Sequence, residues 1–330
     1  MNTAALDQRI EREAWLEARK HYIGATDCAS ILGKGFGTAL SVYNEKLGLP
    51  NVEPDEDQLF RMDVGTALEP LLGEYFTRET KMPLVRVPTM FHPEHSFIGA
   101  NLDFLSVDGR AVVETKTYGI GRHHEFGDEG TDDVPDGYHI QLTIQMGLAI
   151  LNGYDVQGGF LYACSLGSQA RKIWTVPFDQ EFFDLLVSRM CDFWNGHVIP
   201  QVPPQPVAKD EDRVRLAYPS DDGSFVLSDP EDDDLVEQLL GLSARKKAAV
   251  EAFDAKKVLL ISRIGEHAGM DTAHGKVSFK ASASKSVTDW KSVAQGLRPF
   301  ADVDVYLDTV NAHTETKAGS RRLLLPKESN

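Results

Sequence analysis

Ile98-Gly-Ala-Asn-Leu-Asp-Phe-Leu-Ser-Val-Asp-Gly-Arg-Ala-Val-Val-Glu-Thr-Lys116 is the stretch of sequence from which the fold can be read outward. It contains Asp108-Gly109 between two apolar runs, and Asp-Gly in that position is a strong signal for a two-residue β-hairpin. Such a loop pairs the two strands so that Asp103 lies directly opposite Glu114. The sequence therefore predicts a hairpin that carries two facing carboxylates.

The same register predicts which side chains share a face of the hairpin. Side chains two residues apart point the same way, so Asp103, Glu114 and Lys116 are expected to project together. Leu102, Phe104, Val113 and Thr115 are expected on the other face. Two carboxylates about 5 Å apart repel each other unless a positive charge lies between them, and Lys116 or a divalent metal ion would satisfy that need. Mg²⁺ and Mn²⁺ are the ions that prefer such oxygen ligands. An ordinary hairpin with these three residues on its solvated side is the alternative.

Two predicted helices carry polar residues among apolar ones. Glu69 lies within the helix predicted at 58–78, where a buried carboxylate needs a partner or a metal ion. Tyr138, Gln141 and Gln145 follow helical spacing in the apolar helix predicted at 135–152. The stripe fits either a solvated edge or the wall of an active site.

The first 200 residues mix helices with a central sheet, which indicates an α/β domain. Helices are predicted at 8–20, after Asp27, at 58–78, 135–152 and 179–194. Strands are predicted at 84–90, 97–107, 110–118, 159–165 and 172–177, and residues 119–133 read as a loop.

Residues 201–229 are rich in proline and aspartate and are interpreted as a linker. Beyond them, residues 230–330 are predicted to form a smaller appended α+β region. Its helix is expected from Pro230 to about Glu266, with short strands near 276–281 and 303–307. We expect an apolar face of this helix to be covered by the domain before it, by a second subunit or by a partner protein.

Composition restricts the class of protein. The chain has 330 residues, 34 Lys and Arg against 50 Asp and Glu, and a net charge of −16. An apolar fraction of 42% is ordinary for a globular protein, and no apolar run approaches the roughly 20 residues of a membrane-spanning helix. The first residues lack the layout of a secretory signal and there are three cysteines, so the expected location is the cytoplasm. The acidic balance favours a site in which carboxylates do the chemistry.

The order of the motifs resembles one protein family. Arg19, Ile23-Gly-Ala-Thr26-Asp, Gly65-x-x-Leu-Glu69-Pro, Asn101-Leu-Asp103, Glu114-Thr-Lys116 and Tyr138-x-x-Gln141 occur in that order. This pattern resembles the YqaJ viral recombinase family, the phage-lambda-exonuclease-like branch of the PD-(D/E)XK nuclease superfamily, over about residues 12–200. The implied fold is a restriction-endonuclease-like core in which helices flank a mixed central sheet.

The resemblance implies a Mg²⁺-dependent 5′→3′ exodeoxyribonuclease that leaves 3′ single strands on duplex DNA for an annealing recombinase, with Mn²⁺ as a substitute ion. By that resemblance Asp103, Glu114, the backbone carbonyl of Thr115 and Glu69 hold the metal ion, and Lys116 is the catalytic lysine. Gln141 and Tyr138 place water or substrate.

The resemblance also implies that Arg19 and Thr26 bind the 5′ phosphate, although serine is usual at the position of Thr26. It further implies a homo-oligomeric ring, for example a trimer, encoded by a phage or prophage and acting in the host cytoplasm. A structure-specific or restriction-like endonuclease on the same core and a non-catalytic DNA-end-binding subunit are the alternatives.

Overall fold

The computed structural model describes residues 17–282, 289–300 and 302–313, and divides the chain into two compact units, Met1–Pro219 and Ser220–Asn330. The boundary falls inside the stretch 201–229 that was interpreted as a linker. The helix predicted at 8–20 lies mostly outside the described residues. None of the described helices has the length and apolar character needed to cross a membrane.

The first unit is built on a five-stranded mixed sheet with the order β1-β4-β5-β6-β7. Its strands are β1 Leu84–Val85, β4 Phe104–Ser106, β5 Ala111–Tyr118, β6 Gly158–Ser165 and β7 Arg171–Pro177. β5 and β6 are parallel, and the other neighbours are antiparallel. The pairs Phe104 with Val113 and Leu105 with Val112 have the register expected from the Asp108-Gly109 loop, so the hairpin prediction is confirmed.

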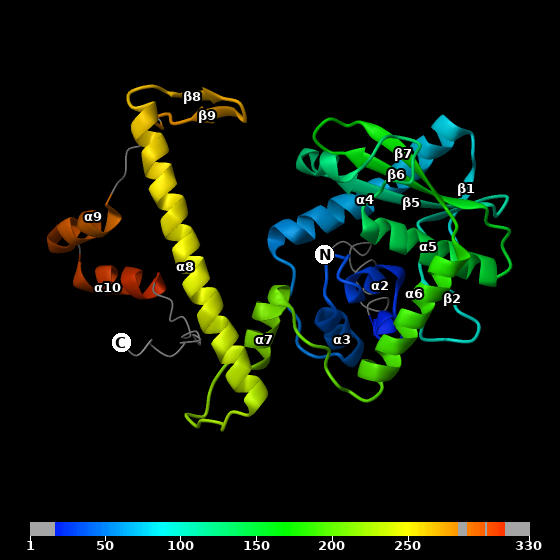
Figure 1. Ribbon diagram of the computed structural model, residues 1–330, viewed down its shortest axis with the longest axis horizontal. Coiled ribbons are helices and arrows are strands. Elements are labelled where there is room, and N and C mark those ends of the chain that lie inside the picture. Colours follow the sequence, from blue (N-terminus) through cyan, green and yellow to red (C-terminus); the bar gives the residue numbers. More distant parts are fainter. Residues whose placement is uncertain (1–16, 283–288, 301, 314–330) are drawn as a thin grey trace. The chain divides into compact units, whose positions relative to one another are not determined.

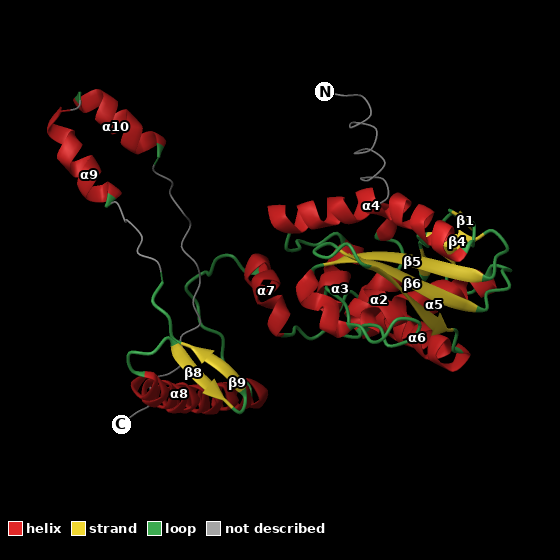
Figure 2. Ribbon diagram, turned by 90° about the horizontal axis from the view of Figure 1, so that it is seen from above, coloured by secondary structure: helices red, strands yellow, loops and turns green. Residues whose placement is uncertain are grey.

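Helices cover both faces of this sheet (Figure 2). α4 Glu56–Thr80 lies on one face, where its side chains join Phe104, Val113 and Tyr162 in a small apolar cluster. α5 Asp136–Leu151 lies on the other face and packs against α2 Ala25–Ile31 and α6 Gln180–Phe193 in the main core. The expected restriction-endonuclease-like arrangement of helices around a mixed sheet agrees with this architecture.

Shorter elements complete the first unit (Figure 1). They are α3 Ala39–Leu47, the two-stranded sheet of β2 Met90–Phe91 and β3 Gly99–Ala100, and α7 Glu211–Ala217. Short helical turns occupy Ile120–Glu125, Trp194–Val198 and Ala208–Asp210. The hydroxyl of Thr38 donates a 2.5 Å hydrogen bond to the fully buried Asp210, which holds the chain before α7 against the start of α3.

The expectation of long strands at 84–90 and 97–107 was wrong. The structure has four short strands there, and β2 and β3 form a sheet of their own. Pro88 and Pro93 lie in this part of the chain, and because proline has no N–H it interrupts a hydrogen-bonded ladder.

The second unit contains α8 Pro230–Ile264, the antiparallel hairpin of β8 Gly269–Thr272 and β9 Gly275–Ser278, α9 Trp290–Leu297, a turn at Arg298–Phe300 and α10 Val303–Ala312. A strand near 303–307 was expected, and the structure has α10 instead. Asp302 caps this helix by accepting hydrogen bonds from the N–H groups of Asp304 and Val305. Val303, Leu307 and Val310 recur at helical spacing, so the short alternation of apolar residues gave the wrong period.

Candidate active site

Glu114 is a carboxylate at the centre of the sheet, with 1% of its surface exposed. Because Gln141 and Gln145 are four residues apart on α5, both amides point at β5. The Nε2 of Gln141 donates to Oε1 of Glu114 over 2.6 Å, and the Nε2 of Gln145 donates to Oε2 over 2.7 Å. The Nζ of Lys116 also donates to Oε1. A buried carboxylate thus has donors on both oxygens, which fixes its orientation.

Burial and neighbouring charges shift the pKa values of Glu114 and Lys116. Burial, followed by the charge of Asp103, raises the pKa of Glu114 to about 7, although Lys116 and Gln145 oppose the change. Burial lowers the pKa of Lys116, but the carboxylates of Glu114 and Asp103 outweigh it and leave that pKa above its usual value. Lys116 is therefore an ammonium group, and its Nζ lies 5.6 Å from the centre of the Tyr138 ring.

Asp103 lies just before β4, and its side chain contacts Thr115, which was expected on the other face of the hairpin. Its Oδ2 accepts hydrogen bonds from the N–H of Thr115 over 2.8 Å and from the hydroxyl of Thr115 over 2.9 Å. The expected separation of Asp103 and Thr115 onto opposite faces is therefore wrong, because regular strand geometry begins at Phe104. The N–H and C=O of a strand residue point to the same side, so the carbonyl of Thr115 also faces the Asp103 side of β5.

Glu69 lies on α4, which covers the face of the sheet opposite to α5. Its side chain is 25% exposed, and its Oε1 accepts a 2.7 Å hydrogen bond from the Nη2 of Arg86. Burial raises the pKa of Glu69, and the charge of Asp103 raises it further against the opposing effect of Arg86. α4 and the hairpin therefore bring Glu69 and Glu114 close enough to Asp103 for the charge of Asp103 to affect both.

The donor chemistry of this neighbourhood fits a hard divalent cation. Carboxylate and carbonyl oxygens are the ligands that Mg²⁺ prefers. The raised pKa values of Glu69 and Glu114 arise first from burial and second from the negative charge of Asp103, and a bound cation would offset both effects. In the described part of the chain no three His, Cys, Asp or Glu side chains are arranged as a ready metal cluster. Each of the three acids instead has protein donors, so ion binding would exchange some of those hydrogen bonds for metal contacts. Within the same residues the buried Oε1 of Gln145 has no hydrogen-bond donor, which leaves an acceptor beside Glu114.

Arg19 is bonded to Asp27, the residue that follows Thr26 at the start of α2. The Nη2 of Arg19 lies 2.5 Å from Oδ1 of Asp27, and Lys46 binds Oδ2 of the same carboxylate over 2.8 Å. The side chain of Lys46 is fully buried, whereas Thr26 is exposed next to this cluster. Although burial raises the pKa of Asp27, Lys46 and Arg19 together lower it below the usual value. The result is a charged group with two cations around one buried aspartate.

Asn101 connects this group to the carboxylates. Its Nδ2 donates to the hydroxyl of Tyr22 over 3.2 Å, and its backbone carbonyl accepts a 3.0 Å hydrogen bond from Gln145. The isolated bridge between Ile23 and Ile98 holds the two chain segments side by side. The segment that carries Arg19 and Thr26 is therefore linked to the carboxylate site through Asn101 and Gln145.

Three residues with direct contacts in the site were not assigned to it from the sequence. Gln145 belonged to the recognised polar stripe of α5, so the signal was present without a role. Arg86 and Lys46 had no motif, because their partners Glu69 and Asp27 are distant in the sequence. Pairing of this kind depends on tertiary structure.

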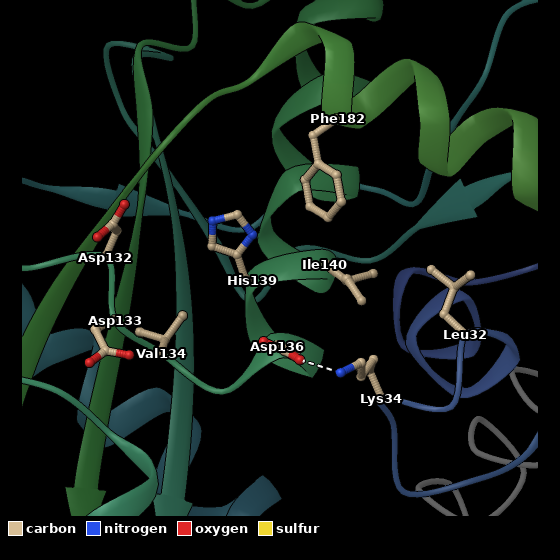
Figure 3. Close-up of a pocket in the computed structure, with 9 residues that line it drawn as sticks. All are labelled: Leu32, Lys34, Asp132, Asp133, Val134, Asp136, His139, Ile140 and Phe182. Carbon is tan, nitrogen blue, oxygen red and sulfur yellow. Dashed lines mark ion pairs between the residues drawn. The ribbon is translucent and has the colours of Figure 1, made fainter.

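A cavity of about 590 Å³ opens on another face of α5 (Figure 3). It is lined by Leu32, Lys34, Asp132, Asp133, Val134, Asp136, His139, Ile140 and Phe182. The Nζ of Lys34 forms a 2.7 Å ion pair with Asp136 there, as the dashed line in Figure 3 shows. None of the residues predicted for the active site lines this cavity.

The fold and the site define a mixed α/β domain with an acidic hairpin and a lysine at its centre. Residues 14–152 match the model of the YqaJ-like viral recombinase domain, so the resemblance inferred from the motifs is confirmed over that stretch.

One curated relative and several solved structures are also similar. The Bacillus subtilis (strain 168) protein named uncharacterized protein YqaJ is 27% identical over 198 residues, which are 59% of each chain, so the match spans about three fifths of that relative. The alkaline exonuclease LHK-Exo from Laribacter hongkongensis superposes with a TM-score of 0.46 at 17% identity, over 62% of this chain and 99% of that one. A phage-related exonuclease from Haemophilus somnus 129PT gives 0.41 at 14% identity, over 53% and 92%.

Proposed function

We propose that this protein is a metal-dependent exodeoxyribonuclease that degrades one strand of a DNA duplex from its 5′ end and leaves a 3′ single strand. The observation that carries the proposal is the buried Glu114, held by Gln141 and Gln145 beside Asp103 and Lys116. The match of residues 14–152 to a viral recombinase domain and the likeness to proteins named exonucleases accord with it.

Asp103, Glu114, Glu69 and the backbone carbonyl of Thr115 are the proposed ligands of Mg²⁺, for which Mn²⁺ can substitute. When bound, the ion supplies positive charge that stabilises the phosphate in the transition state and lowers the pKa of a nearby water. Gln141 and Gln145 hold Glu114 in the orientation that binding requires.

Lys116 keeps its proton and directs Nζ toward the reacting phosphate, where it donates to a developing negative charge. Tyr138 packs beside this ammonium group and limits its movement.

Arg19 and Thr26 are proposed to bind the 5′ phosphate of the strand being degraded. Asp27 and Lys46 hold the arginine in place, and its guanidinium group is suited to phosphate oxygens. Double-stranded DNA ends are then the substrate, a single-strand annealing recombinase is the partner that receives the product, and a ring of subunits, for example a trimer, accounts for processive action. The setting is a phage or prophage recombination system in the bacterial cytoplasm.

The first test uses linear duplex DNA labelled at either the 5′ or the 3′ end. We expect Mg²⁺-dependent loss of the 5′-labelled strand, faster when the end carries a phosphate, and no cutting of a covalently closed circle. Cutting of the circle would replace the proposal with an endonuclease. DNA binding without digestion under Mg²⁺ or Mn²⁺ would replace it with an end-binding subunit.

The second test separates metal binding from turnover. Glu114→Gln and Lys116→Ala should each abolish strand degradation, but calorimetry should show weakened Mn²⁺ binding for Glu114→Gln and retained binding for Lys116→Ala. Glu74→Gln, an exposed site on α4 five residues from Glu69, is the matched control and should change neither quantity. Normal activity of either site variant would remove the assignment.

A further inference from the structure

Glu45 on α3 is a second carboxylate beside the guanidinium group of Arg19. Its Oε1 lies 3.4 Å from Nε of Arg19 and 3.1 Å from Nζ of Lys46. Because α3 packs against α2 (Figure 1), Glu45 and Asp27 approach the same two cations. The formal charges of these four side chains, two positive and two negative, therefore sum to zero.

The two carboxylates of this group differ in how firmly they are held. Asp27 is buried, and its Oδ2 also accepts a 2.8 Å hydrogen bond from the N–H of Gly24. Lys46 is held as well, because its fully buried Nζ donates to the backbone carbonyl of Arg19 over 2.9 Å. The side chain of Glu45 is 36% exposed, so its carboxylate can turn into water. Of the two contacts that Arg19 makes with these acids, the one with Glu45 is therefore the easier to exchange.

Both carboxylates compete with a phosphate for the donors of Arg19. Phosphate oxygens bind to guanidinium N–H groups, but Nη2 of Arg19 faces Asp27 and Nε faces Glu45. Burial lowers the pKa of Arg19, yet the charges of Asp27 and then of Glu45 outweigh it and raise that pKa above its usual value. A phosphate that binds this arginine must take the place of one of these acids.

We propose that Glu45 is the counter-ion that a terminal 5′ phosphate displaces from Arg19, and that Glu45 thereby sets the selectivity of the protein for phosphorylated DNA ends. This inference rests on the proposed binding of the 5′ phosphate by Arg19. When the phosphate binds, Glu45 turns into the solvent while Asp27 and Lys46 continue to hold the guanidinium group. Arg19, Lys46 and Asp27 then carry a net positive charge, which suits the phosphate. Glu45 acts through Arg19, so it determines specificity without touching the reacting atoms.

The charge of the ligand decides which phosphate displaces Glu45. A phosphate monoester, such as a 5′ terminus, carries about −1.5 to −2 charges at pH 7. A phosphodiester inside a strand carries a single negative charge. Because the attraction to Arg19 grows with the charge of the ligand, the terminal phosphate displaces Glu45 more easily than an internal one does. Glu45 therefore opposes the binding of internal phosphates in this pocket and favours the end of the strand.

Equilibrium binding in EDTA tests the exchange without strand degradation. Fluorescence anisotropy measures the Kd of the full-length chain for a duplex that ends in a 5′ phosphate and for the same duplex with a 5′ hydroxyl. Glu45→Gln should lower the Kd for the phosphorylated end by about two- to fivefold, the range expected for loss of a partly exposed ion pair, and leave the Kd for the hydroxyl end unchanged. Glu53→Gln is the matched control, because Glu53 is an exposed acid outside this group, and it should change neither Kd. Thermal unfolding should show that both variants are folded.

The binding data distinguish failure of the inference from failure of the proposed function. Equal Kd values for phosphorylated and hydroxyl ends in the wild type would overturn the 5′-phosphate pocket, and the inference with it. If the wild type prefers the phosphorylated end but Glu45→Gln binds that end no more tightly, only the inference is overturned. Glu45 would then hold Arg19 in place for the phosphate rather than compete with it.

A shorter acid separates the contact of Glu45 from its charge. Glu45→Asp keeps the negative charge but removes one methylene group, so the carboxylate no longer reaches Nε of Arg19. We expect this variant to tighten binding of the phosphorylated end as Glu45→Gln does, because the competing contact is lost in both. A Kd equal to that of the wild type would show that the charge of Glu45 acts without the contact, which contradicts displacement.

Discussion

Gln145 illustrates how a single side chain can control the geometry of the proposed site. Its amide donates to Oε2 of Glu114 and to the backbone carbonyl of Asn101, so it joins the carboxylate to the segment before β4. A donor to a metal-binding carboxylate typically affects metal affinity or activity by about 10- to 100-fold. In the proposed site we therefore expect Gln145 to act as a positioning residue rather than a catalytic one.

We expect Gln145→Leu to lower both Mn²⁺ affinity and strand degradation by about 10- to 100-fold, because Glu114 loses a buried donor. Calorimetry and a labelled-duplex assay measure the two effects. Thr143→Val is the control, because Thr143 is also buried on α5 but donates to the carbonyl of His139. Unchanged metal affinity in Gln145→Leu would show that Gln141 alone orients Glu114.

The ion pairs of Asp27 predict that the stability of the folded state depends on pH. Burial opposes its charge, but the ion pairs with Lys46 and Arg19 prevail and lower its pKa in the folded state. A lowered carboxyl pKa contributes stability that is present above the unfolded value of about 3.9 and is lost as the pH falls through the folded value.

We therefore expect Asp27→Asn to reduce the free energy of unfolding at pH 7 by about 3 kcal/mol, because Lys46 would be left buried without its main counter-ion. The difference from wild type should begin to shrink below about pH 4, where Asp27 of the unfolded chain takes up a proton, and should shrink further as the pH falls through the lower pKa of the folded state. Denaturant unfolding between pH 7 and pH 3 measures this difference. A constant difference over the whole range would contradict the ion-pair explanation.

At the scale of the helix, the close packing of α5 against α6 depends on Gly147. A Cβ atom on Gly147 would lie 2.2 Å from the ring of Phe183, well inside contact distance. Gly147 thus allows the helix that carries Gln141 and Gln145 to approach α6 closely.

Gly147→Ala should destabilise the protein by about 1 to 3 kcal/mol, because overpacking outweighs the usual gain of about 1 kcal/mol for alanine over glycine in a helix. Thermal unfolding measures the change. Gly65→Ala on α4 is the control and should not destabilise, because its nearest described contact would be the hydroxyl of Thr117 at 3.8 Å. Adding Phe183→Leu to Gly147→Ala should recover part of the loss, and its failure to do so would mean that the clash lies elsewhere.

At the scale of the whole molecule, the boundary between the two units lies at Pro219 and Ser220. Phe225, Val226 and Leu227 are each more than nine-tenths exposed, at 99%, 92% and 98%. Exposed loop segments of this kind are preferred sites of proteolytic cleavage.

Limited digestion with chymotrypsin should therefore cut first at Tyr218 or Phe225 and release two fragments that resist further cleavage. Mass spectrometry of the early products identifies the site, and Phe225→Ser should slow the cut after residue 225. First cuts within 119–133 would instead show that the loop of the first unit is the most accessible part of the chain.

Local signals in the sequence were enough to predict much of the secondary structure of the first unit. The register of the hairpin could be predicted from Asp108-Gly109, because turn chemistry acts over a few residues and fixes which strand residues face each other. The start and end of α5 were also predictable from Pro135 and Asn152-Gly153. Residues 303–312 were misread because a short apolar alternation was weighed above the cap at Asp302.

Tertiary structure alone decided how the site is bonded. The sequence placed Asp103, Glu114 and Lys116 on one hairpin, but it could not tell that Glu114 would be buried between two glutamines while Asp103 turned to Thr115. Those differences arise from contacts between residues 12 to 31 positions apart, through the packing of α5 on the sheet. Burial and the resulting changes in pKa depend on all the elements around a side chain, and no local pattern contains that information.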